Sequence, residues 1–194
     1  MEAQKLQLTG GNHQKTRRAL DYYPTPPDVT IALMSFLRLP PCKIWEPACG
    51  DGAMASVLSG FGHEVYASDI RGDSGYGDGG VDYLAEDRRG DYDAIITNPP
   101  FDISDKFILK ALREANIVAM LLKSQYWHAK KRMQLFNDHP PAWVLPLTWR
   151  PDFLFNERVG GERSAPTMEV AWTVWLSGNN MARYKPLPKP IQAK

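Results

Sequence analysis

The sequence is poor in cysteine and histidine and contains no long apolar run. Its 194 residues include two cysteines and four histidines. Neither set has the spacing of a zinc site or a disulfide framework, so we expect no metal and two reduced, buried thiols. No stretch approaches the roughly 20 apolar residues of a transmembrane helix, and the polar segment 1–20 lacks the apolar core of a signal peptide. We therefore expect a soluble cytoplasmic protein that does not enter a membrane.

The chain also lacks a dominant sign of charge. A formal net charge of +1 is far from the strongly basic balance of a dedicated nucleic-acid binder. The charges are nevertheless unevenly distributed, with acids crowded into residues 69–93 and bases clustered at 15–18, 123–132 and 183–194. These basic clusters fit a phosphate-binding footprint and, equally, solvated helix faces and a flexible tail.

Apolar runs alternate with helical patterns, which is typical of a layered α/β domain with a mainly parallel sheet. The length allows one core. We expect a polar leader at 1–20, one domain at 21–178 and a basic, proline-rich tail at 179–194, extended or disordered. Strands are expected at 43–49, 64–70, 91–97, 117–122, 142–149 and 168–176, with a poorly marked one before Val81, and helices from Pro26, after Gly52, within 103–115 and within 129–136.

The segment 44–52 reads as a strand that runs into a turn with glycines at 50 and 52. In an open α/β sheet such a turn lets the backbone approach a ligand closely. A Gly-x-Gly pair by itself is more often a plain tight turn. Asp69 ends the next strand, where an acidic side chain can accept hydrogen bonds from both hydroxyls of a ribose. Asp82 fits either an adenine amine or the cap of a short turn.

The most specific signal is the motif Asn98-Pro99-Pro100-Phe101 at the end of an apolar run. The paired prolines force the backbone out of the sheet. The Asn98 side-chain oxygen and the Pro99 carbonyl can then accept the two N–H groups of an exocyclic amine and favour a pyramidal nitrogen as it attacks. Phe101 offers a flat face on which an extruded base can stack. The alternative is an Asn-Pro turn followed by a core phenylalanine.

Taken together, these motifs resemble those of class I S-adenosylmethionine-dependent methyltransferases, specifically the N6-adenine DNA methyltransferases. The resemblance also covers Tyr23-Pro24-Thr25-Pro26-Pro27, which matches the Tyr-x-Thr-Pro element before the first helix of that family. It implies a Rossmann-like α/β fold with a seven-stranded, mostly parallel sheet whose last strand is antiparallel. It also implies S-adenosylmethionine as the cofactor, with S-adenosylhomocysteine as the product and no metal.

The resemblance also assigns residues to the parts of the cofactor. Its methionine end would lie against Tyr23, Thr25, Pro26, Glu46 and Gly50, its ribose against Asp69 and its adenine against Asp82. The cofactor-binding set is completed by Pro47, Ala48, Ile70, Tyr83 and Asn98, and the catalytic set is Asn98, Pro99, Pro100 and Phe101.

Two departures from the family concern the substrate. Phe101 stands where many relatives have tyrosine, which preserves stacking and removes a hydroxyl. The sequence has no separate target-recognition domain, as in small phage-type adenine methyltransferases. Residues 149–167 form the one sizeable insertion, which is either a substrate contact or a disordered connection. We expect nucleic acid, with DNA as the best candidate, to contact Phe101, Lys123, Trp127, Lys130, Arg150 and Arg163.

Three other functions remain open from the sequence. Related enzymes use an Asn-Pro-Pro-Tyr motif to methylate a glutamine side chain in a protein, and methylation of RNA bases needs the same two acceptors. A third alternative is a non-catalytic relative that binds the cofactor or nucleic acid without turnover. The intact Asn98–Phe101 motif argues against loss of catalysis. The basic, aromatic run at 123–132 favours nucleic acid over protein as the acceptor.

Overall fold

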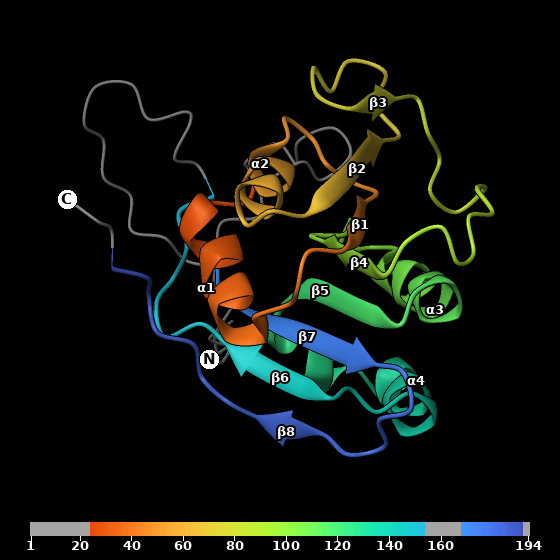
Figure 1. Ribbon diagram of the computed structural model, residues 1–194. Coiled ribbons are helices and arrows are strands. Elements are labelled where there is room, and N and C mark those ends of the chain that lie inside the picture. Colours follow the sequence, from red (N-terminus) through yellow and green to blue (C-terminus); the bar gives the residue numbers. More distant parts are fainter. Residues whose placement is uncertain (1–23, 154–167, 192–194) are drawn as a thin grey trace, which may run out of the picture.

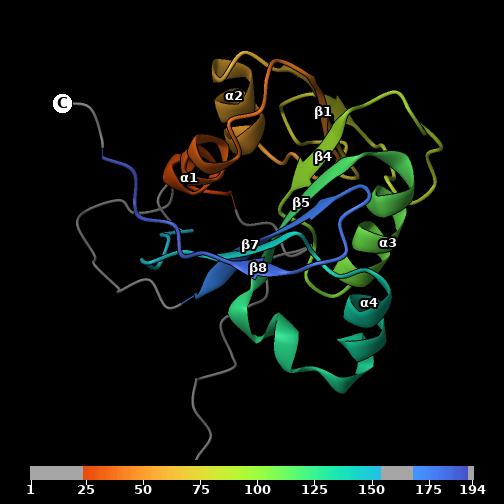
Figure 2. The same cartoon turned by 60° about the horizontal axis from the view of Figure 1, so that its bottom comes forward.

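A central twisted sheet with helices on both faces forms the body of the molecule (Figures 1 and 2). The computed structural model describes residues 24–153 and 168–191. Two predicted site residues, Tyr23 and Arg163, lie outside this described part. Helices α1 (Pro27–Leu37) and α2 (Ala53–Gly60) cover one face of the sheet, while α3 (Ser104–Glu114) and α4 (Met133–Asp138) cover the other.

Eight strands form the sheet within the described residues, in the order β3-β2-β1-β4-β5-β7-β6-β8. Strand β7 runs antiparallel to both β5 and β6, and the remaining pairs are parallel. Their bounds are β1 Lys43–Glu46, β2 Glu64–Asp69, β3 Asp78–Gly79, β4 Ala94–Thr97, β5 Ile117–Lys123, β6 Trp143–Pro146, β7 Val170–Leu176 and β8 Arg183–Tyr184.

The central strands are apolar on both faces because helices cover both faces. Side chains alternate along a strand, so Ile44 and Ile96 join the core beneath α1 and α2. Their neighbours Trp45 and Ile95 join the core beneath α3 and α4. This arrangement explains the near-continuous apolar runs, which are typical of strands buried in a parallel sheet.

The order of the strands reverses between β1 and β4, which are hydrogen-bonded neighbours. The chain therefore leaves the carboxyl ends of two adjacent parallel strands in opposite directions. In open α/β sheets this arrangement opens a crevice at the strand ends, where ligands bind. The segment after β1 carries the glycine turn, and the segment after β4 carries Asn98 and its prolines.

The mostly parallel sheet and the antiparallel strand at 170–176 confirm the predicted fold class. An eighth strand that the sequence did not indicate adds to this sheet. Residues 183–184 of the predicted tail form β8, which pairs with β6. Beyond it, the Leu187 N–H donates to the Pro146 carbonyl at 2.8 Å, and the Leu187 side chain is 2% exposed. This part of the tail is extended and packed against the sheet.

None of the helices in the described residues combines the length and the apolar character needed to cross a membrane. Within the same ranges, no group of three or more histidine, cysteine, aspartate or glutamate side chains is placed to hold a metal ion.

Candidate active site

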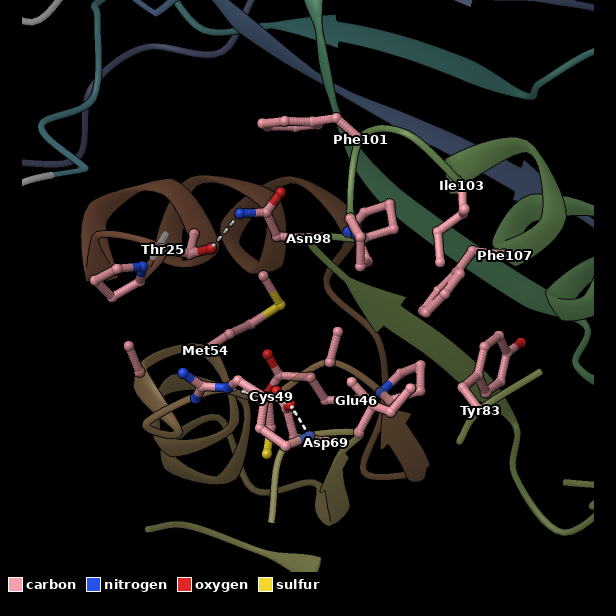
Figure 3. A pocket seen from close by; sticks show the side chains of 18 of the residues that line it. Thr25, Glu46, Cys49, Met54, Asp69, Tyr83, Asn98, Phe101, Ile103 and Phe107 are labelled. Carbon is pink, nitrogen blue, oxygen red and sulfur yellow. Dashed lines mark hydrogen bonds and ion pairs between the residues drawn. The ribbon is translucent and has the colours of Figure 1, made fainter. Parts of the chain in front are cut away.

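A pocket lies at the carboxyl ends of β1, β2 and β4, between the glycine turn and the Asn98 loop (Figure 3). Its empty volume is about 810 Å³, counted into the open solvent at its mouth. Twelve of the predicted site residues line it: Thr25, Glu46, Pro47, Ala48, Asp69, Ile70, Asp82, Tyr83, Asn98, Pro99, Pro100 and Phe101. Pro26 and Gly50 are not among the lining residues.

The turn after β1 requires glycine at two positions. Gly50 has a φ of 57° and Gly52 a φ of 81°, both in the left-handed region that side chains disfavour. Close packing adds a second constraint at Gly52, because a Cβ there would lie 2.2 Å from the Tyr76 ring. The two glycines therefore hold the turn in a conformation that other residues disfavour, between lining residues Cys49 and Ala53.

Asp69 ties the glycine turn to the end of β2. One carboxylate oxygen accepts the Gly50 N–H at 2.8 Å, and the other accepts the Arg71 N–H at 2.8 Å. The Arg71 Nε also lies 3.4 Å from the second oxygen. A carboxylate has about four acceptor positions, so these contacts fix its orientation and leave acceptor capacity for a ligand in the pocket. Asp69 thus shapes the turn as well as lining the site.

Glu46 brings an unpaired acidic group to the pocket. Its side chain is 2% exposed, and its Oε2 atom has no hydrogen-bond partner. Burial raises the pKa of this carboxyl well above its usual value, although a hydrogen bond from the Ala55 backbone opposes the shift. A buried carboxylate without a cation is unfavourable, so a positively charged ligand group would complement it. The ammonium and sulfonium groups of S-adenosylmethionine have this charge.

The part of the pocket that Ile70, Asp82 and Tyr83 line suits a flat base. Ile70 is 55% exposed although it is apolar, and it lies on the pocket wall. Asp82 accepts the Leu84 N–H at 3.0 Å through one oxygen, which is the turn-capping contact considered from the sequence, and it lines the pocket as well. Tyr83 is 1% exposed and packs between Trp45 and Phe107.

The loop after β4 holds Asn98 and Phe101 at the pocket mouth. The Asn98 Nδ2 atom donates to the Thr25 Oγ1 atom at 3.2 Å. This contact turns the amide oxygen toward the side of Phe101 (Figure 3). Ser104 at the start of α3 donates its hydroxyl to the Phe101 carbonyl at 3.0 Å. The motif is thereby attached to α3 on one side and to the segment before α1 on the other.

Of the five predicted substrate residues that the structure describes, Phe101 lines the pocket, Lys123 contacts its ring, and the other three lie elsewhere. The Lys123 Nζ atom, at the end of β5, lies 3.9 Å from the centroid of the Phe101 ring. Trp127 stacks on Phe136 with centroids 4.1 Å apart. Lys130 is exposed in the 3₁₀ helix η3 (Lys130–Arg132), which follows η2 (Ser124–His128), and Arg150 pairs with Glu169 at 2.6 Å. None of these three lines the pocket.

Sequence reasoning missed seven lining residues: Pro24, Cys49, Ala53, Met54, Arg71, Ile103 and Phe107. Met54 and Phe107 carried a signal, since each lies on the apolar side of a helix that follows a motif, and Ile103 immediately precedes the second of these helices. Burial raises the pKa of Cys49 to about 12, so this side chain stays a neutral thiol in the pocket.

The chain resembles known proteins in its structure and not in its sequence. No protein-family description matches the chain, and no curated protein matches its sequence. Solved structures do match. One is a protein from Pyrococcus horikoshii, provisionally assigned as an RNA methyltransferase, with a TM-score of 0.63 and 16% identity over 81% of this chain and 87% of that one.

Two further matches belong to restriction-modification systems. The type I methyltransferase subunit from Streptococcus thermophilus has a TM-score of 0.61 and 11% identity, over 84% of this chain and 47% of that one. The modification subunit of a provisionally assigned type I restriction enzyme from Vibrio vulnificus YJ016 has a TM-score of 0.58 and 13% identity, over 85% and 47%. This chain therefore spans about half the length of those two subunits. The chain has the Rossmann-like fold of methyltransferases.

Proposed function

We propose that this protein transfers a methyl group from S-adenosylmethionine to the N6 amino group of adenine in DNA. The observation that carries the proposal is the position of Asn98. Its amide is oriented by Thr25 and lies at the mouth of a pocket whose other walls suit a nucleoside with a cationic end. The methyltransferase fold of the similar structures supports the same reaction class.

The pocket residues match the cofactor group by group. The Glu46 carboxylate would pair with the ammonium of the methionine end, because it is buried and unpaired. Asp69 would accept the ribose hydroxyls, while Ile70 and Asp82 would contact the face and the amine of the adenine. S-adenosylmethionine, when bound, supplies the methyl group and leaves as S-adenosylhomocysteine.

The residues of the Asn98 loop would act on the acceptor amine. An exocyclic amine is a poor nucleophile because its lone pair is delocalised into the ring. The Asn98 oxygen and the Pro99 carbonyl would accept its two N–H groups and favour the pyramidal nitrogen of the transition state. Phe101 would support the extruded base by stacking, worth about 1–3 kcal/mol. After transfer the nitrogen loses a proton to solvent, so no histidine is needed.

Nucleic acid as the acceptor is supported by the surface beside the mouth. Lys123 touches the Phe101 ring, and the chain then enters η2 and η3, where Lys130 and Lys131 are exposed. Neither of these two lysines forms an ion pair with another described residue. Lys123 at the catalytic loop and the exposed lysines that follow it along the chain would hold a phosphate backbone while one base enters the site. Two of the similar structures are subunits of restriction-modification systems.

The acceptor is tested by incubating the protein with methyl-labelled cofactor and separate samples of DNA, RNA and protein. The labelled sample is then digested to nucleosides or amino acids. We expect N6-methyladenine from DNA. Label in RNA bases or in glutamine would show that the acceptor is not DNA, while the reaction would still be methyl transfer from S-adenosylmethionine. The absence of transfer to any acceptor by a protein that binds the cofactor would contradict the proposal.

A further inference from the structure

Two buried charges of opposite sign lie on α3 behind the pocket. Lys110 and Glu114 are 8% and 6% exposed, and their side chains form an ion pair one helical turn apart. Replacing a buried ion pair by apolar residues of similar volume is often neutral or stabilising. Stabilisation of α3 is therefore a weak explanation for this buried ion pair. The other contacts of Lys110 indicate what the pair does.

The Lys110 ammonium holds a segment of the pocket wall. It donates to the Glu86 main-chain carbonyl at 2.6 Å. Glu86 closes a turn that begins at Asp82, because the N–H groups of Ala85 and Glu86 both donate to the Asp82 carbonyl, at 3.0 and 3.2 Å. The Leu84 N–H donates to the Asp82 side chain at 3.0 Å. Fixing Glu86 therefore fixes the whole turn that carries the Asp82 carboxylate.

The same ammonium supports the aromatic part of this wall. It lies 4.8 Å from the centroid of the Tyr83 ring. Tyr83 also packs against Trp45 and Phe107, with centroid distances of 4.9 and 4.8 Å, and its side chain is buried. Asp82 and Tyr83 line the pocket, whereas Lys110 and Glu114 touch it only through them.

We infer that Lys110 and Glu114 are positioning residues for the base of the cofactor. By holding the 82–86 turn and the Tyr83 ring, they aim the Asp82 carboxylate at the exocyclic amine of adenine. The inference rests on the proposed cofactor and is independent of the acceptor. The ion pair with Glu114 holds the Lys110 side chain over the turn. Lys110 in turn fixes the turn through its hydrogen bond to the Glu86 carbonyl.

The test compares two ligands that differ at the amine. S-adenosylhomocysteine has the donor that Asp82 would bind, whereas S-inosylhomocysteine has a carbonyl in its place. Calorimetry should show the parent binding the adenine form about tenfold more tightly, the worth of one hydrogen bond to a charged group. In Lys110→Met/Glu114→Leu this ratio should fall to about two or less, because the turn is released. A thermal melt of the same variant checks that it is folded.

A merely structural role for the pair would weaken both ligands equally and leave the ratio unchanged. Lys106→Met is the matched control, since Lys106 is an exposed lysine one turn earlier on α3, and it should keep the parental ratio. If the double variant does not fold, Glu114→Gln serves in its place and should give an intermediate ratio.

Three results would overturn the inference. A parental ratio in the folded variant would show that the turn does not depend on the pair. Equal binding of the two ligands by the parent would show that Asp82 does not recognise the amine, while the cofactor assignment would stand. Failure of the parent to bind either ligand would overturn the proposed function, and this inference with it.

Discussion

At the scale of single residues, Glu46 combines a cost to the fold with a role in binding. Burial raises the pKa of this carboxyl, so the folded state binds its proton more readily than the unfolded state does. Protonation of Glu46 therefore stabilises the fold fully below the pKa that this carboxyl has in the unfolded state. This contribution is lost as the pH rises through its pKa in the folded state. Ionisation of this buried carboxyl therefore costs folding free energy when no cation lies beside it.

Glu46→Gln should therefore stabilise the empty protein at neutral pH. Each kcal/mol gained raises the melting temperature by about 2–4 °C at this size, and the gain should shrink as the pH falls toward the usual range of glutamate. Cofactor affinity should fall in the same variant, by about 1.5–3 kcal/mol, because the ammonium loses its charged partner. Thermal melts across pH and calorimetry measure both effects. Glu64→Gln, on the exposed start of β2, should show neither, and a destabilised Glu46→Gln variant would contradict the assignment.

At the scale of elements, the glycine turn after β1 depends on packing as well as on backbone conformation. Gly62 has a similar φ of 87°, but a Cβ there would meet no atom within 4 Å. Gly62→Ala should therefore cost about 1–2 kcal/mol from the left-handed conformation alone. Gly52→Ala should cost more, because its Cβ would overlap the Tyr76 ring. Denaturant unfolding of both variants compares the two costs, and an equal loss would show that Tyr76 moves aside freely.

The strands also differ in how far the sequence predicts them. The strands around Trp45 and Ile95 were predictable, since each is a run of apolar residues that helices bury on both faces. Strands β3 and β8 have two residues each, too few for a period-two pattern. They form because β2 and β6 offer an edge. Within the pocket, the motif residues were predictable, whereas Arg71 lines it because of a turn around Asp69.

At the scale of the whole molecule, the proposal predicts where electrostatic binding takes place. Lys130 and Lys131 are exposed in η3, which follows the carboxyl end of β5 and η2 along the chain. Alanine at either position should weaken DNA binding and reduce the slope of log affinity against log salt by about 0.9 if each lysine contacts one phosphate. Fluorescence anisotropy over a salt series measures this slope.

The control for that series is Arg89→Ala. Arg89 is exposed and pairs with Asp87 in the segment between β3 and β4. It should leave the slope unchanged. A slope that depends on Arg89 and not on Lys130 or Lys131 would place the nucleic acid away from η3.

The proposed function requires Asn98 to take part in methyl transfer, and the rate of that transfer can be measured. The measurement is the formation of N6-methyladenine in DNA by Asn98→Ala at saturating cofactor. Loss of an acceptor that acts mainly in the transition state should lower this rate by about 10²–10³ while cofactor affinity stays near the parental value. Methylation by Asn98→Ala at the parental rate would contradict the account.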